Sequence, residues 1–283
     1  MPGLRLGGLV LEPIPFQPEW VERIESQEVR DSSLRRAEAI DCFRFFYRSN
    51  GHRVEGFLAE PKTGERLPCI VYNRGGSADF SAWTDQRFSL SYAARFAEKG
   101  YLVIASQYSG AGQSEGVDQF GGEELNDVFA LHDLLRADPR ADAGRIGMYG
   151  VSRGGMMTYL ALKQADWIKA AVVTAGTTDL RTTDFRPKME GHYRAFFGGA
   201  PEERAKRSVL AWVDRLPKNV PLLLCHGTAD WRVDPLGALR LAERCYEEKI
   251  PCRLIWYEGT DHQLSETWKH AFREWVDWFN RFV

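Results

Sequence analysis

The chain has 283 residues, with 37 lysine and arginine residues against 39 aspartate and glutamate residues, so its formal net charge is −2. This balance, without a long basic run, argues against nucleic acid as the main ligand. A hydrophobic fraction of 44% argues against a disordered chain, and no segment approaches the ~20 apolar residues of a membrane helix.

Two features indicate a cytoplasmic protein. Residues 1–10 lack the apolar core of a signal peptide. The cysteines are odd in number and form no Cys-x-x-Cys pair, which fits reduced thiols in a reducing compartment. We interpret them as structural, because most lie in or beside apolar runs. The five cysteines are Cys42, Cys69, Cys225, Cys245 and Cys252.

Residues 1–40 differ from the rest of the chain and are interpreted as an N-terminal arm. Three prolines break its start, and residues 20–40 predict a charged helix. The arm could lie over an active site, clasp a second subunit or pack on the surface. A homodimer therefore stays open.

Strand patterns begin after the arm. Residues 41–47 and 52–59 alternate between apolar and polar positions around Asn50-Gly51, the usual signal of a tight β-hairpin. Short apolar runs follow, of the kind found in strands buried on both faces of a parallel sheet. These runs cover residues 69–72, 102–105, 145–149, 170–175, 221–225 and 253–257.

Helical periodicity fills the gaps between these runs. The predicted helices cover residues 85–99, 123–137, 154–164, 235–248 and 266–282. In the last of them, large apolar side chains recur every three or four residues and predict one buried face. The alternation predicts an α/β fold, a doubly wound and mostly parallel sheet of about eight strands with helices on both faces. We expect one catalytic domain over residues 41–283, with a lid-like insertion at residues 176–219.

Two segments match the Gly-x-Ser-x-Gly pattern of a nucleophile elbow, around Ser114 and Ser152. An elbow needs a strand that runs into the first glycine and a helix that begins at the serine. The run 145–149 and the helical segment 154–164 meet this requirement for Ser152. Around Ser114, the strand ends several residues earlier and the next helix begins only later. The sequence therefore predicts Ser152 as a nucleophile and Ser114 as a loop residue.

A serine hydroxyl needs a base to take its proton and a carboxylate to orient that base. In hydrolases with this elbow, the acid and the histidine follow the serine in loops at the same sheet edge. Asp230 follows the strand 221–225, and His262 follows the strand 253–257. We therefore predict Ser152, Asp230 and His262 as a catalytic triad.

Neighbouring polar residues have other expected roles. Asp234 precedes a proline and predicts a helix cap, Asp261 is expected to point elsewhere, and His226 to stabilise its turn. No spacing resembles a zinc site or a nucleotide-binding loop, so we expect neither metal nor cofactor.

The tetrahedral intermediate of acyl transfer needs two N–H donors in an oxyanion hole. The backbone N–H of Arg153 is the first, and the loop 72–77 supplies the second, for which we predict Gly76 or, failing it, Gly75. Aromatic residues nearby in the sequence are candidates for the substrate pocket, and the insertion could be a lid or a plain packed subdomain. These aromatic residues are Phe80, Trp83, Trp231, Tyr193 and Phe197.

From about residue 43 onward, the chain resembles the catalytic domain of the prolyl oligopeptidase family of serine peptidases. The similarity rests on Gly-Val-Ser-Arg-Gly-Gly155, on Gly-Thr-Asp-His262 and above all on His226-Gly-Thr-Ala-Asp230-Trp-Arg-Val233. It implies an α/β-hydrolase fold with Ser152 as nucleophile, His262 as base and Asp230 as acid.

The sequence departs from this family in three places. Only about 40 residues precede the match, so we expect no N-terminal propeller like the one found in this family. The usual His-Gly-Gly-Pro of the oxyanion loop becomes Arg74-Gly-Gly-Ser77, and Arg153 replaces a more usual aromatic or polar residue.

Together these features predict a serine hydrolase that cleaves an ester or a peptide bond through an acyl-enzyme. The expected substrate is a small ester or a short peptide, and serine peptidase and carboxylesterase both stay open. A binding protein of the same fold that has lost turnover is a remote alternative, against which the complete triad argues.

Overall fold

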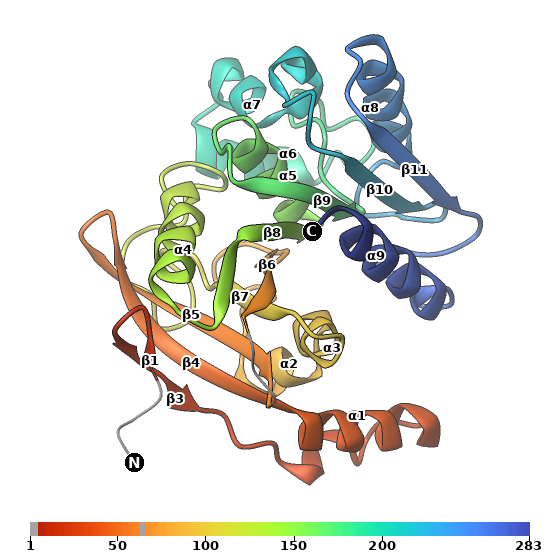
Figure 1. Cartoon of the computed structure of the whole chain (residues 1–283). Helices are drawn as coiled ribbons and strands as arrows, with labels where there is room; N and C mark the ends of the chain where they lie inside the picture. The colour runs from red at the N-terminus through yellow and green to blue at the C-terminus, as the bar shows by residue number, and fades with distance from the viewer. Residues whose placement is uncertain (1–4, 63–65) are drawn as a thin grey trace. The chain divides into compact units, whose positions relative to one another are not determined.

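The structure is a computed structural model that describes residues 5–62 and 66–283 (Figure 1). The chain divides into two compact units. Unit 1 comprises Met1–Tyr72, Ala78–Asp118 and Asn126–Ile146, and unit 2 comprises Asn73–Ser77, Gln119–Leu125 and Gly147–Val283. The predicted arm thus falls in the range of unit 1, and its boundary at residue 40 stays a prediction.

Unit 1 is built on a mixed sheet. Its strands are hydrogen-bonded in the order β6 (Leu67–Asn73), β7 (Leu102–Ser106), β5 (His52–Pro61), β4 (Ile40–Ser49) and β3 (Glu12–Pro13). Strands β6 and β7 are parallel, whereas β5 is antiparallel to both β7 and β4.

The predicted hairpin joins β4 to β5. Ser49 pairs with His52 across Asn50 and Gly51, whose φ angles are 49° and 80°. Positive φ at both central residues is the turn geometry that an Asn-Gly pair favours. The hairpin prediction is therefore confirmed.

The helices of unit 1 are shorter than periodicity predicts. They are α1 (Gln27–Ala39), α2 (Asp85–Leu90), α3 (Tyr92–Glu98) and most of α4 (Leu125–Ala137). Before α1, the chain forms the short strands β1 (Arg5–Leu6) and β2 (Leu9–Val10) and a 3₁₀ turn, η1 (Pro18–Val21). Helix α1 begins at residue 27 rather than 20, because the Ser26 hydroxyl accepts from Val29 N–H and caps it there. The predicted helix 85–99 is interrupted at Ser91, which is extended (ψ 178°) and caps α3 through its side chain.

Unit 2 contains the carboxyl end of β8 (Ala141–Val151) and then β9 (Ile168–Thr174), β10 (Leu222–Gly227) and β11 (Cys252–Tyr257), in that order. The last three are parallel neighbours, and every residue of β10 is buried. A parallel sheet needs this burial because its crossover helices cover both faces. The mainly parallel α/β architecture is therefore confirmed.

Helices pack on these strands. Helix α5 (Arg153–Leu162) contacts β9, α8 (Pro235–Glu247) contacts β10 and β11, and α9 (Trp268–Phe282) contacts β9 and β10. Figure 1 shows α8 and α9 in blue at the blue strands β10 and β11. The buried face predicted for α9 is present: Trp275 is fully buried and donates its indole N–H to Cys225 Sγ.

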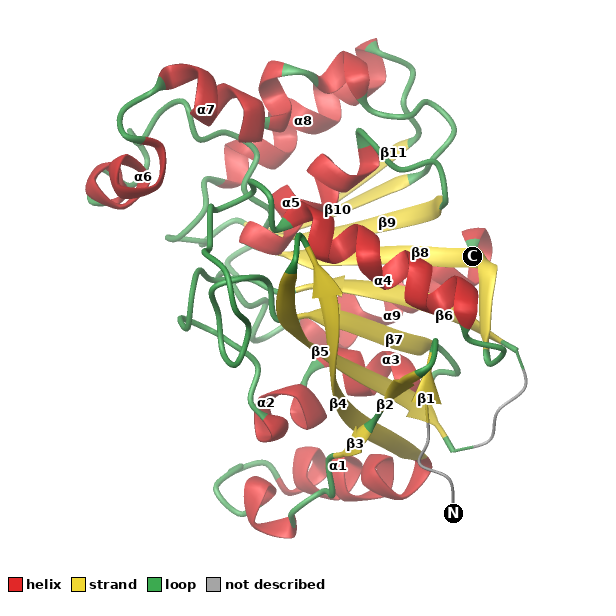
Figure 2. Ribbon diagram, turned by 90° about the vertical axis from the view of Figure 1, so that its left-hand side faces the viewer, coloured by secondary structure: helices red, strands yellow, loops and turns green. Residues whose placement is uncertain are grey.

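The insertion at residues 176–219 holds two short helices, α6 (Met189–Phe197) and α7 (Pro201–Arg207), and the 3₁₀ turns η2 (Val209–Ala211) and η3 (Val213–Arg215) (Figure 2). Among the residues that the structure describes, no helix has both the length and the apolar character to cross a bilayer.

Candidate active site

Ser152 lies in unit 2 between the end of β8 and the start of α5. Its backbone angles, φ 57° and ψ −122°, belong to a region that residues other than glycine rarely adopt. Two positions before and after it, only glycine fits: a Cβ atom at Gly150 would lie 2.2 Å from Gly154 O, and one at Gly154 would lie 2.0 Å from Asn73 O. This is the sharp strand–turn–helix geometry that the Gly-x-Ser-x-Gly pattern predicts.

Ser114, the serine of the second matching segment, belongs to unit 1 and has a different setting. It lies between β7 and α4, in a loop without an adjoining strand or helix. Its hydroxyl accepts a hydrogen bond from Glu55 N–H at 3.0 Å. Its interpretation as a loop residue agrees with this position.

Asp230 and His262 follow β10 and β11 and meet in the structure. His262 Nδ1 lies 2.7 Å from Asp230 Oδ2, and both side chains are buried. The two parallel strands run in register to their ends, where Gly227 pairs with Tyr257. Loops that leave neighbouring parallel strands emerge at one edge of the sheet, which brings together residues 32 positions apart.

The carboxylate of Asp230 has four hydrogen-bond donors. Oδ2 also lies 3.0 Å from His226 Nε2, and Oδ1 accepts from the backbone N–H groups of Arg232 and Val233 at 2.8 and 3.0 Å. Burial raises the pKa of Asp230, but the hydrogen bonds with His226 and His262 outweigh it and hold the pKa well below its usual range. Asp230 is therefore a carboxylate throughout the physiological pH range.

His226 is a contact of the acid that sequence reasoning missed. Its predicted role in stabilising the turn agrees with its contact to Asp230 four residues on, and its ring nitrogen also shares Oδ2 of Asp230 with His262. Its spacing of four residues from Asp230 was the available signal. Because Nε2 also faces the carbonyl oxygen of Val233 at 3.3 Å, both neighbours of this nitrogen are acceptors and it must carry the proton.

The hydroxyl of Ser152 makes no hydrogen bond to His262 or to any other side chain among the described residues. Hydrogen bonds between a nucleophile and its base are often long before substrate binds and tighten in the substrate complex. The structure thus contains the hydrogen bond between His262 and Asp230 and the strained backbone of Ser152, and the pairing of Ser152 with His262 belongs to the proposal below.

The segments predicted to form the oxyanion hole lie beside Ser152. Arg153 is the first residue of α5, where backbone N–H groups have no partner within the helix. A Cβ atom at Gly75 would lie 3.2 Å from Ser152 Cβ and 3.8 Å from its Oγ, so this backbone passes directly along the serine. Gly76 has φ 76°, and its carbonyl oxygen accepts from the Arg153 guanidinium at 3.0 Å.

The aromatic residues predicted for the substrate pocket divide between the two units. In unit 2, Trp231 adjoins Asp230 and is 55% exposed, while Tyr193 and Phe197 of α6 pack around Phe120 at centroid distances of 5.9 and 6.2 Å. Phe120 is a member of this cluster that the sequence did not single out.

In unit 1, Phe80 is 65% exposed and Trp83 packs on aromatic neighbours. The ring of Trp83 lies 5.4 Å from that of Tyr72 and 5.5 Å from that of Phe88. Trp83 therefore contributes to the packing of its own unit, and its role in a pocket stays a prediction.

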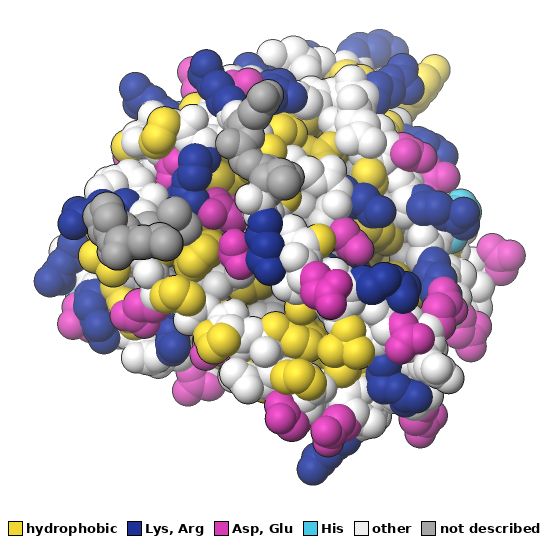
Figure 3. Space-filling model, turned by 60° about the horizontal axis from the view of Figure 1, so that its bottom comes forward, with side chains coloured by type: hydrophobic (Ala, Val, Ile, Leu, Met, Phe, Trp, Pro, Cys, Tyr) yellow, Lys and Arg dark blue, Asp and Glu magenta, His cyan; other side chains and the backbone are white. Residues whose placement is uncertain are grey.

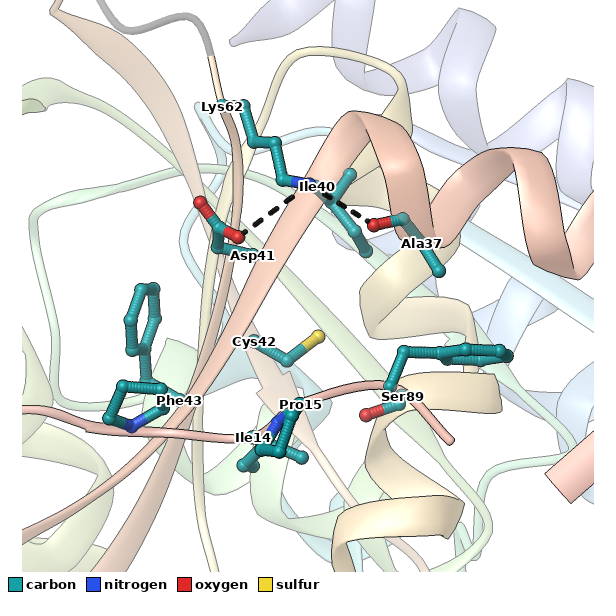
Figure 4. A pocket seen from close by; sticks show the side chains of 11 residues that line it. Ile14, Pro15, Ala37, Ile40, Asp41, Cys42, Phe43, Lys62 and Ser89 are labelled. Atoms are coloured by element: carbon teal, nitrogen blue, oxygen red, sulfur yellow. Dashed lines mark hydrogen bonds and ion pairs between the residues drawn. The ribbon is translucent and has the colours of Figure 1, made fainter. Parts of the chain in front are cut away.

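Unit 1 contains a cavity of about 380 Å³ beside β4 (Figure 4). Figure 3 shows the lower face of Figure 1, where hydrophobic side chains gather between charged ones. None of the described residues that line the cavity is a histidine, and burial raises the pKa of its thiol, Cys42, to about 12. A thiol with a raised pKa is a poor nucleophile at neutral pH, so Cys42 does not give this cavity an activated nucleophile.

Sequence comparison places the chain among known hydrolases. The model of the prolyl oligopeptidase family matches residues 86–283. The uncharacterized peptidase YtmA of Bacillus subtilis is 30% identical over 230 residues, which are 79% of this chain and 86% of that protein. The protein named "Putative esterase YitV", from the same organism, is 24% identical over 250 residues, covering 80% of this chain and 93% of its own length.

Solved structures show the same fold. The acylaminoacyl peptidase of Pyrococcus horikoshii superposes with a TM-score of 0.76 at 22% identity, over 89% of this chain. The chain spans 43% of that larger protein, and the similarity establishes the α/β-hydrolase fold. With the family model matching most of the chain and a relative at 30% identity, the chain is a hydrolase that belongs to the prolyl oligopeptidase family.

Proposed function

We propose that the protein is a serine hydrolase in which Ser152 is the nucleophile, His262 the general base and Asp230 the acid that orients it. The observation that carries this proposal is the buried hydrogen bond of 2.7 Å between His262 Nδ1 and Asp230 Oδ2. It joins the two loops in which the order of a hydrolase triad requires these residues. The strained backbone of Ser152, in the same unit, supports it.

The hydrogen bond also fixes the tautomer of the base. Because Nδ1 of His262 donates to an ionised carboxylate, its Nε2 is left free to accept a proton. In the proposed reaction, Ser152 Oγ attacks the carbonyl carbon of the substrate while Nε2 takes the hydroxyl proton. The negative charge moves to the carbonyl oxygen, where the backbone N–H of Arg153 and that of Gly76 or Gly75 stabilise it.

The second half of the reaction releases the products. The tetrahedral intermediate collapses and expels an amine or alcohol, which takes its proton from His262. A water molecule then gives a proton to His262 as it attacks the acyl-enzyme. The second tetrahedral intermediate collapses, the acid leaves, and His262 returns the proton to Ser152 Oγ.

We propose a short peptide as the substrate, supported by the name peptidase that YtmA carries. A small ester is the second candidate, because the relative matched over 93% of its length is named an esterase. We also propose a cytoplasmic location, which the odd number of cysteines and the lack of a Cys-x-x-Cys pair in the sequence support. A homodimer formed through residues 1–40 stays a prediction.

The test compares Ser152→Ala with Ser114→Ala, the serine of the other matching segment. We expect Ser152→Ala to abolish labelling by a fluorophosphonate probe and hydrolysis of p-nitrophenyl esters while the melting temperature is retained. The Ser114→Ala variant should keep both activities. Full labelling of the Ser152→Ala variant would refute the assignment.

A second measurement separates the two substrate classes. The specificity constants of the wild type for aminoacyl amides and for short acyl esters are compared at equal pH. A peptidase should show a measurable specificity constant for the amides as well as for the esters, whereas an esterase should cleave the esters alone.

A further inference from the structure

Arg153, which follows the proposed nucleophile, has a deeply buried side chain. Only 2% of this side chain is exposed, although its backbone begins a helix at a sheet edge. A charged side chain is almost never buried to this degree unless it is paired. The contacts of its guanidinium group therefore have to account for its position.

The guanidinium joins three segments of unit 2. Its Nη2 donates to Glu124 Oε1 at 2.7 Å, and its Nη1 donates to the carbonyl oxygen of Gly76 at 3.0 Å. Its Cζ lies 4.8 Å from the ring centroid of Phe120. One side chain thus links the first turn of α5 to the oxyanion loop, Asn73–Ser77, and to the segment Gln119–Leu125.

Glu124 is itself fixed to the backbone. Its side chain is fully buried, and its carboxylate accepts from Gly121 N–H and, at 3.0 Å, from Gly122 N–H. The partner of Arg153 is therefore a carboxylate with little freedom to move. A buried pair held in this way places the Gly76 carbonyl group in one orientation relative to α5.

We propose that the Arg153–Glu124 pair positions the oxyanion loop, so that the backbone N–H groups of α5 and of Gly75–Gly76 are aligned before the substrate arrives. This rests on the proposed function. The fork of a guanidinium can bond a carboxylate and a carbonyl oxygen at the same time, which is why arginine is needed here. Preorganised donors stabilise a developing oxyanion without reorganisation during the reaction.

The pair has to be distinguished from a purely structural ion pair. Replacing a buried ion pair by apolar residues of similar volume is often neutral or stabilising, whereas removing one partner leaves an unpaired charge. The double variant Arg153→Met/Glu124→Leu should therefore keep the fold while it releases the Gly76 carbonyl. Arg153→Lys keeps the charge but replaces the planar fork, which bonds Glu124 and Gly76 from two different nitrogens, with a single nitrogen on a shorter side chain.

The readouts are kcat per active site, titrated with a fluorophosphonate, together with KM and the inhibition constant of an alkyl boronic acid. The boronic acid forms a tetrahedral adduct that resembles the intermediate. We expect both variants to lose about 10²-fold in kcat, the effect of disturbing one oxyanion donor. The boronic acid should bind more weakly by a similar factor, while KM changes by less than about threefold.

Arg36→Met is the matched control, because Arg36 is equally buried, pairs with Glu98 at 3.1 Å and belongs to unit 1. It should lower the melting temperature and leave kcat per titrated site unchanged. A kcat within threefold of the wild type in either Arg153 variant would overturn the proposal. Should Ser152→Ala still be labelled, the proposed function itself fails, an outcome independent of these variants.

Discussion

Gly154→Ala tests how closely the elbow is packed against the oxyanion loop. A Cβ atom built at Gly154 would lie 2.0 Å from Asn73 O, 2.6 Å from Asn73 C and 2.7 Å from Arg74 O. All three are backbone atoms, so no side-chain rotation can make room. Real Cβ atoms essentially never come closer than 3.0 Å to such atoms, and the two backbones must separate by about 1 Å.

This displacement should lower both stability and activity. Overpacking in a tightly packed region costs about 1–3 kcal/mol, and more where the backbone itself has to shift. A misplacement of about 1 Å in a catalytic arrangement can cost ~10²-fold in rate. We therefore expect Gly154→Ala to unfold at lower urea concentration and to show a kcat per titrated site reduced about 10²-fold.

Gly191→Ala is the control for this substitution. Gly191 lies in α6, and a Cβ atom there meets nothing within 4 Å. The change from glycine to alanine in a helix should stabilise the protein by up to about 1 kcal/mol. If Gly154→Ala had the urea midpoint and the kcat of the wild type, the close packing of α5 on the oxyanion loop would be refuted.

Two further predictions concern titratable groups. Asp230→Asn should lower kcat about 10⁴-fold. It should also change the pH dependence of stability. Because the pKa of Asp230 is depressed in the folded protein, its carboxylate stabilises the folded state above about pH 4 and loses this effect as the pH falls lower. The difference in unfolding free energy between the wild type and Asp230→Asn, from urea titrations, should narrow below that pH; a constant difference would contradict the depressed pKa. Burial raises the pKa of the thiols of Cys42, Cys69 and Cys225 to about 12. Iodoacetamide should therefore leave these three thiols unmodified in the native protein and react with all five cysteines in urea. Mass spectrometry of the alkylated protein measures both outcomes. Alkylation of any of the three in the native protein would contradict their buried positions.

The proximity of Asp230 and His262 could be predicted from the sequence because the relevant information is local. Each of Asp230 and His262 lies just after an apolar run, and parallel strands place their carboxyl ends at one edge. Both residues can be identified from the sequence around them, without knowledge of any long-range contact. Their order after Ser152 was sufficient to expect the hydrogen bond that the structure contains.

Contacts that depend on distant segments could not be predicted in this way. Glu124 precedes Arg153 by 29 positions and follows two glycines just before a helix. An acidic residue at such a place in the sequence is expected to be exposed to solvent at the start of the helix. Nothing in its neighbourhood signals that it is buried. The break at Ser91 was missed for a related reason, because apolar periodicity continues across a single extended residue.

The backbone conformation supplies the evidence that distinguishes the two matching serines. Ser152 has a positive φ, and backbone hydrogen bonds, among them those to the end of β9 and to the residues after it, keep Ser152 in this strained conformation. Its N–H donates to Thr174 O at 3.0 Å, and its carbonyl oxygen accepts from Gly155 and Thr177 N–H at 3.0 and 3.1 Å.

A non-glycine residue in such a conformation costs about 1–3 kcal/mol and persists only where its surroundings determine it fully. At Ser152, both backbone polar groups are bonded, so the surroundings meet this condition. Around Ser114, the positive φ angles fall on Gly112 and Gly116, which adopt them without strain. A strained backbone at the serine itself, rather than positive φ at the flanking glycines, is therefore the physical difference between these two segments of the same sequence pattern.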